Sequence, residues 1–145
     1  MMNAITEKMT PARILVVDDF APIRKFTTMV LEKEVGFRVV AEAADGRQAI
    51  QLAKESKPDL VVLDLDLPFL CGIEVARQIR SYSPDSTILF FSINNDPDVV
   101  EAALQTGALG YVLKLDAFDD LLNAAKTVLS GKRFVSRGLN SKSVS

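Results

Sequence analysis

Apolar residues gather in five short runs along the chain, and a segment with helical periodicity follows each run. Unbroken apolar runs of this length are typical of parallel strands that helices cover on both faces. The second run is interrupted by Arg38 and Glu42, so it is predicted to lie at an edge of the sheet. The runs are Ile14–Val17, Phe37–Ala41, Leu60–Leu63, Ile88–Phe91 and Tyr111–Leu113. The pattern predicts a strand and a helix repeated five times.

Capping residues mark where several of the helices begin. Pro22 suits the first turn of a helix, because a backbone N–H has no intrahelical partner there. Asp45 is a predicted N-cap with Gln48 three residues on, which is the spacing of a capping box. Asp96 followed by Pro97 predicts the start of the fourth helix. Strands that alternate with helices in this way favour an α/β fold with a parallel sheet.

Acidic residues follow directly on two of the predicted strands. Asp18 and Asp19 close the first strand, and Asp64 closes the third. The carboxyl ends of parallel strands share one edge of the sheet, so these carboxylates are expected to lie together. Two carboxylates about 4 Å apart repel by roughly 4 kcal/mol at an effective dielectric near 20, so the cluster needs a cation or a shifted pKa. With oxygen as the only ligand type, the expected cation is Mg²⁺.

A hydroxyl group and an ammonium group are predicted at the same edge. Ser92 follows the fourth strand and Lys114 follows the fifth. Taken singly, the serine suits a helix cap and the lysine suits a solvated surface charge. Together with the acids they supply what phosphoryl transfer to an aspartate requires, since its transition state spreads negative charge over three oxygens.

Composition narrows the classes of function. The 145 residues suit one domain, and a net charge of −2 with 25% charged residues disfavours direct binding to nucleic acid. Histidine is absent, which excludes Ser-His-Asp and Cys-His catalysis, and the single cysteine, Cys71, excludes an internal disulfide framework. Residues 1–12 lack the apolar core of a signal peptide, and no apolar run approaches the ~18 residues of a membrane span. The expectation is a cytoplasmic protein without membrane contact.

These motifs together resemble the receiver domain of two-component response regulators. The resemblance runs from about Arg13 to Phe134 and implies a flavodoxin-like (βα)5 fold. That fold is a doubly wound, five-stranded parallel sheet of strand order 2-1-3-4-5, with three helices on one face and two on the other. The matching motifs are the pair Asp18-Asp19, the segment Leu63-Asp64-Leu65-Asp66-Leu67-Pro68 with Gly72 four residues beyond its proline, Ser92, and the run Gly110-Tyr111-Val112-Leu113-Lys114.

The resemblance implies that Asp64 is the phosphoacceptor, which takes a phosphoryl group from the phosphohistidine of a histidine kinase. It also implies a Mg²⁺ site. Asp19 and Asp64 would bind the ion directly with the backbone carbonyl of Asp66, and Asp18 would act through water.

Three further residues have implied roles around the phosphoryl group. Lys114 would pair with its oxygens, Ser92 would hydrogen-bond to it, and Tyr111 would change rotamer with it, so that Ser92 and Tyr111 form a switch. The chain would catalyse its own phosphorylation and dephosphorylation without being an enzyme in the usual sense. Phosphorylation would change a protein-interaction surface.

Leu115 departs from the most common receiver pattern, because many members have a proline at this position. The segments Lys114–Ala117 and Gly131–Ser136 resemble instead the branch whose receivers usually precede a LuxR-type helix-turn-helix domain. The expected partners are a histidine kinase, an output domain or effector protein, and a second copy in a phosphorylation-dependent homodimer.

The predicted division of the chain has three parts. Residues 1–12 are expected to form a flexible N-terminal segment, and residues 13–134 the receiver domain. Residues 135–145 are polar and serine-rich, which favours a tail or the start of a linker.

Two alternatives remain open at this point. A haloacid-dehalogenase-like phosphatase would use Asp64-Leu65-Asp66 as its nucleophile motif, although that motif normally follows the first strand of its fold. A receiver that works as a docking module without phosphate would usually lack an acidic or lysine residue of the site, and none is missing here.

Overall fold

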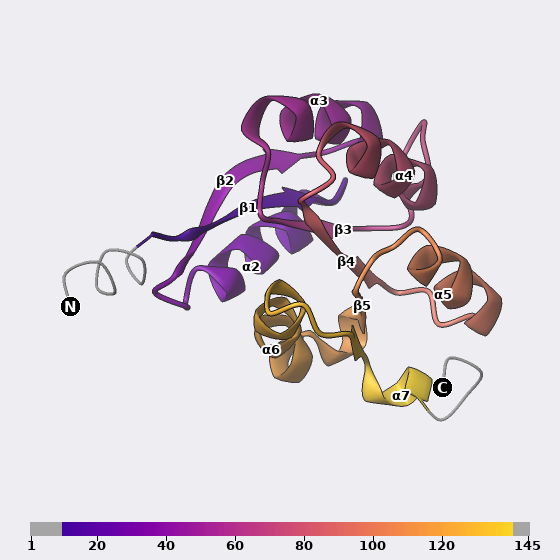
Figure 1. Cartoon of the computed structure of the whole chain (residues 1–145). Helices are drawn as coiled ribbons and strands as arrows, with labels where there is room; N and C mark the ends of the chain where they lie inside the picture. The colour runs from indigo at the N-terminus through magenta and orange to yellow at the C-terminus, as the bar shows by residue number, and fades with distance from the viewer. Residues whose placement is uncertain (1–9, 141–145) are drawn as a thin grey trace.

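The computed structural model describes residues 10–140, which form a parallel sheet with helices on both faces (Figure 1). The strand order is β2-β1-β3-β4-β5-β6. This confirms the flavodoxin-like parallel sheet and the edge position of the second strand. The strands are β1 Ala12–Val17, β2 Phe37–Ala43, β3 Leu60–Leu63, β4 Thr87–Ser92, β5 Gly110–Leu113 and β6 Phe134–Val135.

The strand register brings the carboxyl ends of the central strands to one edge. Val17 of β1 pairs with Leu63 of β3, and Leu63 pairs with Phe90 of β4. Ser92 of β4 pairs with Leu113 of β5. The residues that follow these strands therefore start from neighbouring positions along one rim.

The five main helices cover the two faces of the sheet in the predicted arrangement of three and two, and the short helix α7 adds Leu139 to the core of the three-helix face. One hydrophobic core lies under α3, α4 and α5, and the other lies under α2 and α6 (Figure 1). Ile14 and Leu15 point to opposite cores and are both fully buried, and each burial stabilises the fold by about 1.5–3 kcal/mol. The helices are α2 Ala21–Leu31, α3 Gly46–Ser56, α4 Gly72–Tyr82, α5 Pro97–Leu104, α6 Ala117–Leu129 and α7 Arg137–Asn140, with a 3₁₀ helix, η1, at Lys114–Asp116.

The predicted helix caps are present. The Asp45 carboxylate accepts a hydrogen bond from the Gln48 N–H at 2.8 Å, and the Gln48 side chain in turn accepts one from the Ala44 N–H. Asp96 accepts a bond from the Asp98 N–H at 2.9 Å, with Pro97 as the first residue of α5. These caps satisfy backbone N–H groups at the helix starts, which have no hydrogen-bond partner in the helical backbone.

The prediction of five strands is wrong by one strand. β6 extends the sheet beyond β5, and α7 follows it, with Ser136 and Leu139 buried. A two-residue strand has too little hydrophobic pattern to be recognised in the sequence, and it forms because the outer edge of β5 offers unpaired backbone groups. The predicted boundary at residue 134 therefore falls inside β6, and buried residues continue to Leu139.

The two predicted terminal segments extend beyond the described part of the chain. Residues 1–9 and 141–145 lie outside it, and β1 begins at Ala12. Among the described residues, none of the helices is long and apolar enough to cross a membrane.

Gly72 allows α4 to approach the end of β3 closely. A Cβ atom on Gly72 would lie 2.4 Å from the carbonyl oxygen of Asp64 and 2.7 Å from the Cα of Leu65. We expect Gly72→Ala to lower the free energy of unfolding by about 1–3 kcal/mol, because backbone atoms cannot yield to the added methyl group. Urea denaturation followed by circular dichroism measures this.

Gly36→Ala is the matched control, because nothing lies within 4 Å of a Cβ atom built there. We expect this change to alter stability by less than about 1 kcal/mol. Equal effects of the two substitutions would contradict the close approach at Gly72.

Candidate functional site

Three carboxylates converge where β1 and β3 end. Asp18 and Asp64 are 2% and 4% exposed, and Asp19 lies open to solvent beside them. One carboxylate oxygen from each residue lies within 4.8 Å of the others. They border a pocket of about 340 Å³, which is lined by Asp18, Asp19, Phe20, Ile23, Asp64, Asp66, Ile93 and Lys114.

Lys114 brings a positive charge into this pocket from the end of β5. Its Nζ lies 2.7 Å from Asp18 Oδ2 and 3.4 Å from Asp64 Oδ2, and its side chain is 14% exposed. A buried ammonium between two carboxylates offsets part of their repulsion. Lys114 is therefore placed to contact any anionic group that joins Asp64.

Two neighbouring contacts hold Asp18 in place at the start of α2. The Asp18 carboxylate accepts a hydrogen bond from the Phe20 N–H at 3.0 Å. The guanidinium of Arg24 donates to the Asp18 carbonyl at 2.8 Å and to the Glu42 carboxylate at 3.1 Å. The loop after β1 is thus tied to α2 and β2.

Ser92 ends β4 and Tyr111 lies within β5, and neither of them lines the pocket. The Ser92 hydroxyl accepts a hydrogen bond from the Asn94 N–H at 3.0 Å, and the Tyr111 hydroxyl donates to the Asn94 carbonyl at 2.6 Å. Burial raises the pKa of Tyr111 to about 12, a hydrogen bond with Ser92 lowers it, and the charges of Asp66 and Asp64 raise it. Tyr111 is consequently neutral, and both hydroxyls contact the same loop after β4.

Burial raises the pKa of Asp64 to about 6. The charge of Lys114 opposes this effect, the charge of Asp18 adds to it, and hydrogen bonds from the Asp66 N–H and Lys114 lower the pKa. The Asp66 N–H lies 3.3 Å from Asp64 Oδ1. Without a cation the ionised form of Asp64 is therefore less stable than that of an exposed aspartate, even with Lys114 nearby.

The donor set fits a hard divalent cation. Asp18, Asp19 and Asp64 offer carboxylate oxygens within one ion's reach, and no nitrogen or sulfur ligand stands among them. Oxygen-only donors with exposure on one side suit Mg²⁺, which keeps several waters and takes few protein ligands.

The sequence did not single out three apolar residues of the pocket. Phe20, Ile23 and Ile93 line it, and Phe20 and Ile93 are largely exposed. Two of them directly follow predicted site residues, Asp19 and Ser92. This adjacency in the sequence could have indicated that they line the site, but apolar residues next to a helix are ordinarily packing residues.

The raised pKa of Asp64 makes stability depend on pH. The folded chain holds the Asp64 proton more tightly than the unfolded chain, whose carboxyl has a pKa near 3.8, so the free energy of unfolding falls as pH rises from about 4 to 6. We expect Asp64→Asn to add up to about 3 kcal/mol at pH 8 in metal-free buffer and little at pH 4. Urea denaturation at both pH values tests this.

Asp85→Asn is the control, because Asp85 is exposed between α4 and β4. It should change stability by less than about 0.5 kcal/mol at either pH. A stabilisation by Asp64→Asn of the same size at pH 4 and pH 8 would contradict the raised pKa.

Comparisons with known proteins identify the family of this chain. Residues 14–126 match the family model described as response regulator receiver domain. The nitrate/nitrite response regulator protein NarL of Escherichia coli K12 is 36% identical over 129 residues, which cover 89% of this chain and 60% of NarL. The transcriptional regulatory protein DegU of Brevibacillus brevis is 34% identical over 123 residues, 85% of this chain and 52% of DegU. The chain thus spans between half and two thirds of the length of these relatives.

A solved structure gives the same result for the fold. The crystal structure of a LuxR-family two-component response regulator from Aurantimonas sp. SI85-9A1 superposes with a TM-score of 0.87 at 37% identity, covering 91% of this chain and 94% of that one. The match includes the sheet whose edge carries the acidic pocket. This chain belongs to the response regulator receiver domain family.

Proposed function

We propose that this chain is the phosphoryl-accepting receiver of a two-component system and that Asp64 is its phosphoacceptor. The observation that carries the proposal is the position of Lys114, whose Nζ lies between the buried carboxylates of Asp18 and Asp64. An ammonium at this position can pair with a phosphoryl group on Asp64, because the phosphoryl oxygens carry the negative charge. The comparisons give no support to the phosphatase alternative.

The proposed step is an in-line displacement. A carboxylate oxygen of Asp64 forms a bond to phosphorus while the bond from phosphorus to the imidazole nitrogen of the donor breaks, and that nitrogen keeps the electron pair and takes up a proton. Lys114 pairs with the developing charge on the phosphoryl oxygens, and the Asp66 N–H, which faces Asp64 Oδ1, helps to orient the nucleophile. The chain thus promotes its own phosphorylation and dephosphorylation without being a conventional enzyme.

Asp19 and Asp64, with the backbone carbonyl of Asp66, would hold Mg²⁺, and Asp18 would act through water. Bound there, the ion would neutralise the carboxylates and the charge on the transferred group. The Asp18 carboxylate already has Lys114 at 2.7 Å, which supports an indirect role for Asp18. Asp19 is exposed and open to a hydrated cation.

Ser92 and Tyr111 are the proposed switch. Both hydroxyls contact Asn94 in the loop after β4, so a phosphate that attracts the Ser92 hydroxyl would also disturb the bond from Tyr111. The surface of α5, β5 and α6 would then shift between two pre-existing states.

The proposed partners follow from the family. A histidine kinase would supply the phosphoryl group, and an output domain or effector protein would read the changed surface, with homodimerisation on phosphorylation as a further response. The relatives named NarL and DegU are longer than this chain, and the proposal for it is limited to the receiver role in the cytoplasm. A net charge of −2 disfavours direct contact of this chain with nucleic acid.

Asp64→Asn should abolish phosphorylation, because an amide is not nucleophilic. We expect the parent chain, incubated with Mg²⁺ and acetyl phosphate, to gain the mass of one phosphoryl group on the Asp64 peptide. The Asn variant should gain none. Label on another peptide of the parent chain would show that the phosphoacceptor is misassigned.

Asp66→Asn is the matched substitution, because Asp66 lines the same pocket. We expect it to form phospho-Asp64 at a similar rate and to change only the lifetime of the product, measured by intact mass after removal of acetyl phosphate. In a phosphatase Asp66 would be the general acid and base, and its loss would cost about 10²- to 10⁴-fold in turnover. Collapse of phospho-Asp64 formation would therefore contradict the receiver proposal.

Asp19→Ala should lower Mg²⁺ affinity by at least about tenfold, because magnesium takes few protein carboxylates and each direct ligand matters. Asp18→Ala should have a smaller effect. Isothermal titration of Mg²⁺ into each variant compares them. Negligible effects of both substitutions would mean that the ion binds elsewhere.

Lys114→Ala should leave phosphorylation of Asp64 possible but slower by on the order of 10²-fold, since the lysine stabilises charge and does not perform the attack. It should also remove the conformational response. The rate is measured by intact mass and the response by amide chemical shifts in the loop after β4. A response equal to that of the parent chain would exclude this role for Lys114.

A further inference from the structure

The outer edge of β5 is paired for only part of its length. β6 pairs Phe134 with Gly110 and Val135 with Tyr111, and the Ser136 N–H donates to the Tyr111 carbonyl at 3.0 Å. The strand ends there, and α7 follows it (Figure 1). The N–H of Leu113, two residues further along β5, receives no partner from the backbone of β6.

The Ser136 side chain completes this edge. Its Oγ accepts a hydrogen bond from the Leu113 N–H at 2.9 Å, and Ser136 is fully buried. The hydroxyl thus takes the place of the carbonyl that a longer strand would supply. Leu113 directly precedes Lys114, so this bond fixes the backbone of the residue before the lysine.

On its other side Lys114 is held by the single turn of η1, where its carbonyl accepts a hydrogen bond from the Ala117 N–H. No side chain caps the start of this short helix. The Leu115 side chain is 92% exposed, so it cannot hold the turn by packing. The chain that enters Lys114 is therefore fixed by the end of β5, which pairs with Ser92 on one edge and is held by Ser136 on the other.

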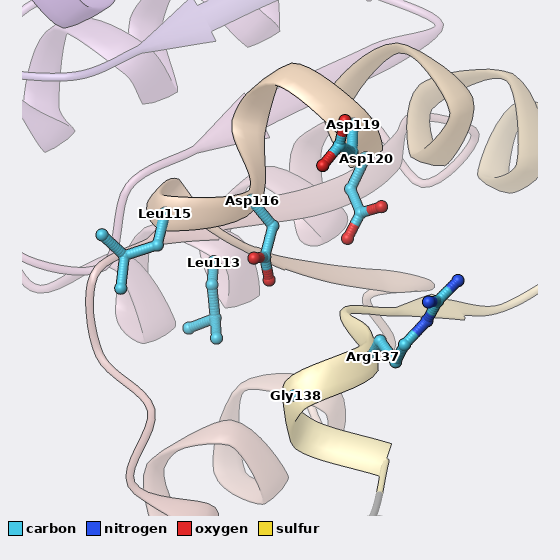
Figure 2. Close-up of a pocket in the computed structure, with 7 residues that line it drawn as sticks. All are labelled: Leu113, Leu115, Asp116, Asp119, Asp120, Arg137 and Gly138. Atoms are coloured by element: carbon cyan, nitrogen blue, oxygen red, sulfur yellow. The ribbon is translucent and has the colours of Figure 1, made fainter.

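Asp120 is a neighbour of the Ser136 hydroxyl. The Asp120 carboxylate, in the first turn of α6, interacts with this hydroxyl, and the interaction lowers the pKa of Asp120. Figure 2 shows Asp120 and Arg137 across a pocket at this end of α6. Burial and the charges of Asp116 and Asp119 raise the pKa of Asp120, whereas Arg137 and Ser136 favour its charged form.

We propose that Ser136 is a positioning residue for Lys114. Its hydroxyl fixes the end of β5 so that the Lys114 ammonium reaches Asp18 and Asp64 together. This assignment rests on the role proposed above for Lys114. It extends the phosphoacceptor site to the segment that follows α6, because the side chain that completes β5 belongs to the chain leading into α7.

A double-mutant cycle tests the proposal. The rate of phospho-Asp64 formation from acetyl phosphate and Mg²⁺ is measured by intact mass for the parent chain, Ser136→Ala, Lys114→Ala and the double variant. In the parent chain, Ser136→Ala removes one hydrogen bond and should slow phospho-Asp64 formation about three- to tenfold. In the Lys114→Ala background the same substitution should slow phospho-Asp64 formation by less than about twofold. The effects of two residues are not additive when one acts through the other.

Three further variants separate positioning from stability. Ser136→Thr retains the hydroxyl and should restore most of the rate. Asp120→Ala, at a partly exposed site, should also slow the reaction. It replaces Ser136→Ala in the test if that variant does not fold. Ser86→Ala removes another buried hydroxyl, which donates to the Pro58 carbonyl at the opposite end of the sheet, and should leave the rate unchanged.

The outcomes distinguish this proposal from the one on which it rests. Equal slowing by Ser136→Ala in both backgrounds, or no slowing in the parent chain, would overturn the positioning role while leaving that of Lys114 intact. A Lys114→Ala variant as fast as the parent chain would overturn both. Slowing confined to chains that carry Lys114, together with rescue by threonine, is the expected result.

Discussion

Repulsion among carboxylates at one edge of the sheet is the constraint on which the rest of the site depends. Asp18 and Asp64 are almost fully buried, and their charges are balanced only in part by the ammonium of Lys114. Burial and like charge together raise the pKa of Asp64 to about 6, so a bound cation would stabilise the ionised form of this carboxylate. Because ionisation of Asp64 is costly, its protonation is sensitive to any cation that binds beside it.

The sheet holds these groups at the distances that the chemistry needs. The register between β1 and β3 places Asp18 and Asp64 side by side, and the N–H of Asp64 donates to the carbonyl of Val17 at 3.0 Å. Gly72 lets α4 pack directly on the backbone of Asp64 and Leu65. Close packing on both sides limits how far the carboxylates can separate, so their repulsion is retained in the folded chain.

Hydrogen bonds at the ends of β4 and β5 connect the pocket with the outer parts of the molecule. Ser92 and Tyr111 share Asn94, and the edge of β5 beside Lys114 is completed by Ser136. A change at Asp64 would therefore act on two outer segments, the loop after β4 and the chain that leads into α7. The first segment leads into α5 and the second follows α6, so both adjoin the surface that the proposed function assigns to signalling.

The sequence by itself determined the local features and the order of the elements. The apolar runs, the Asp45 and Asp96 caps, the edge position of β2 and the acids at strand ends follow from periodicity and from neighbouring residues, and the structure has all of them. Only the tertiary structure decided that β6 forms and that Ser136 reaches Leu113. It also decided that Lys114 approaches Asp18 more closely than Asp64, and that Asp64 is buried enough to raise its pKa. Each of these depends on groups far apart in the chain, whose distance and burial are set by packing and leave no pattern in the sequence near them.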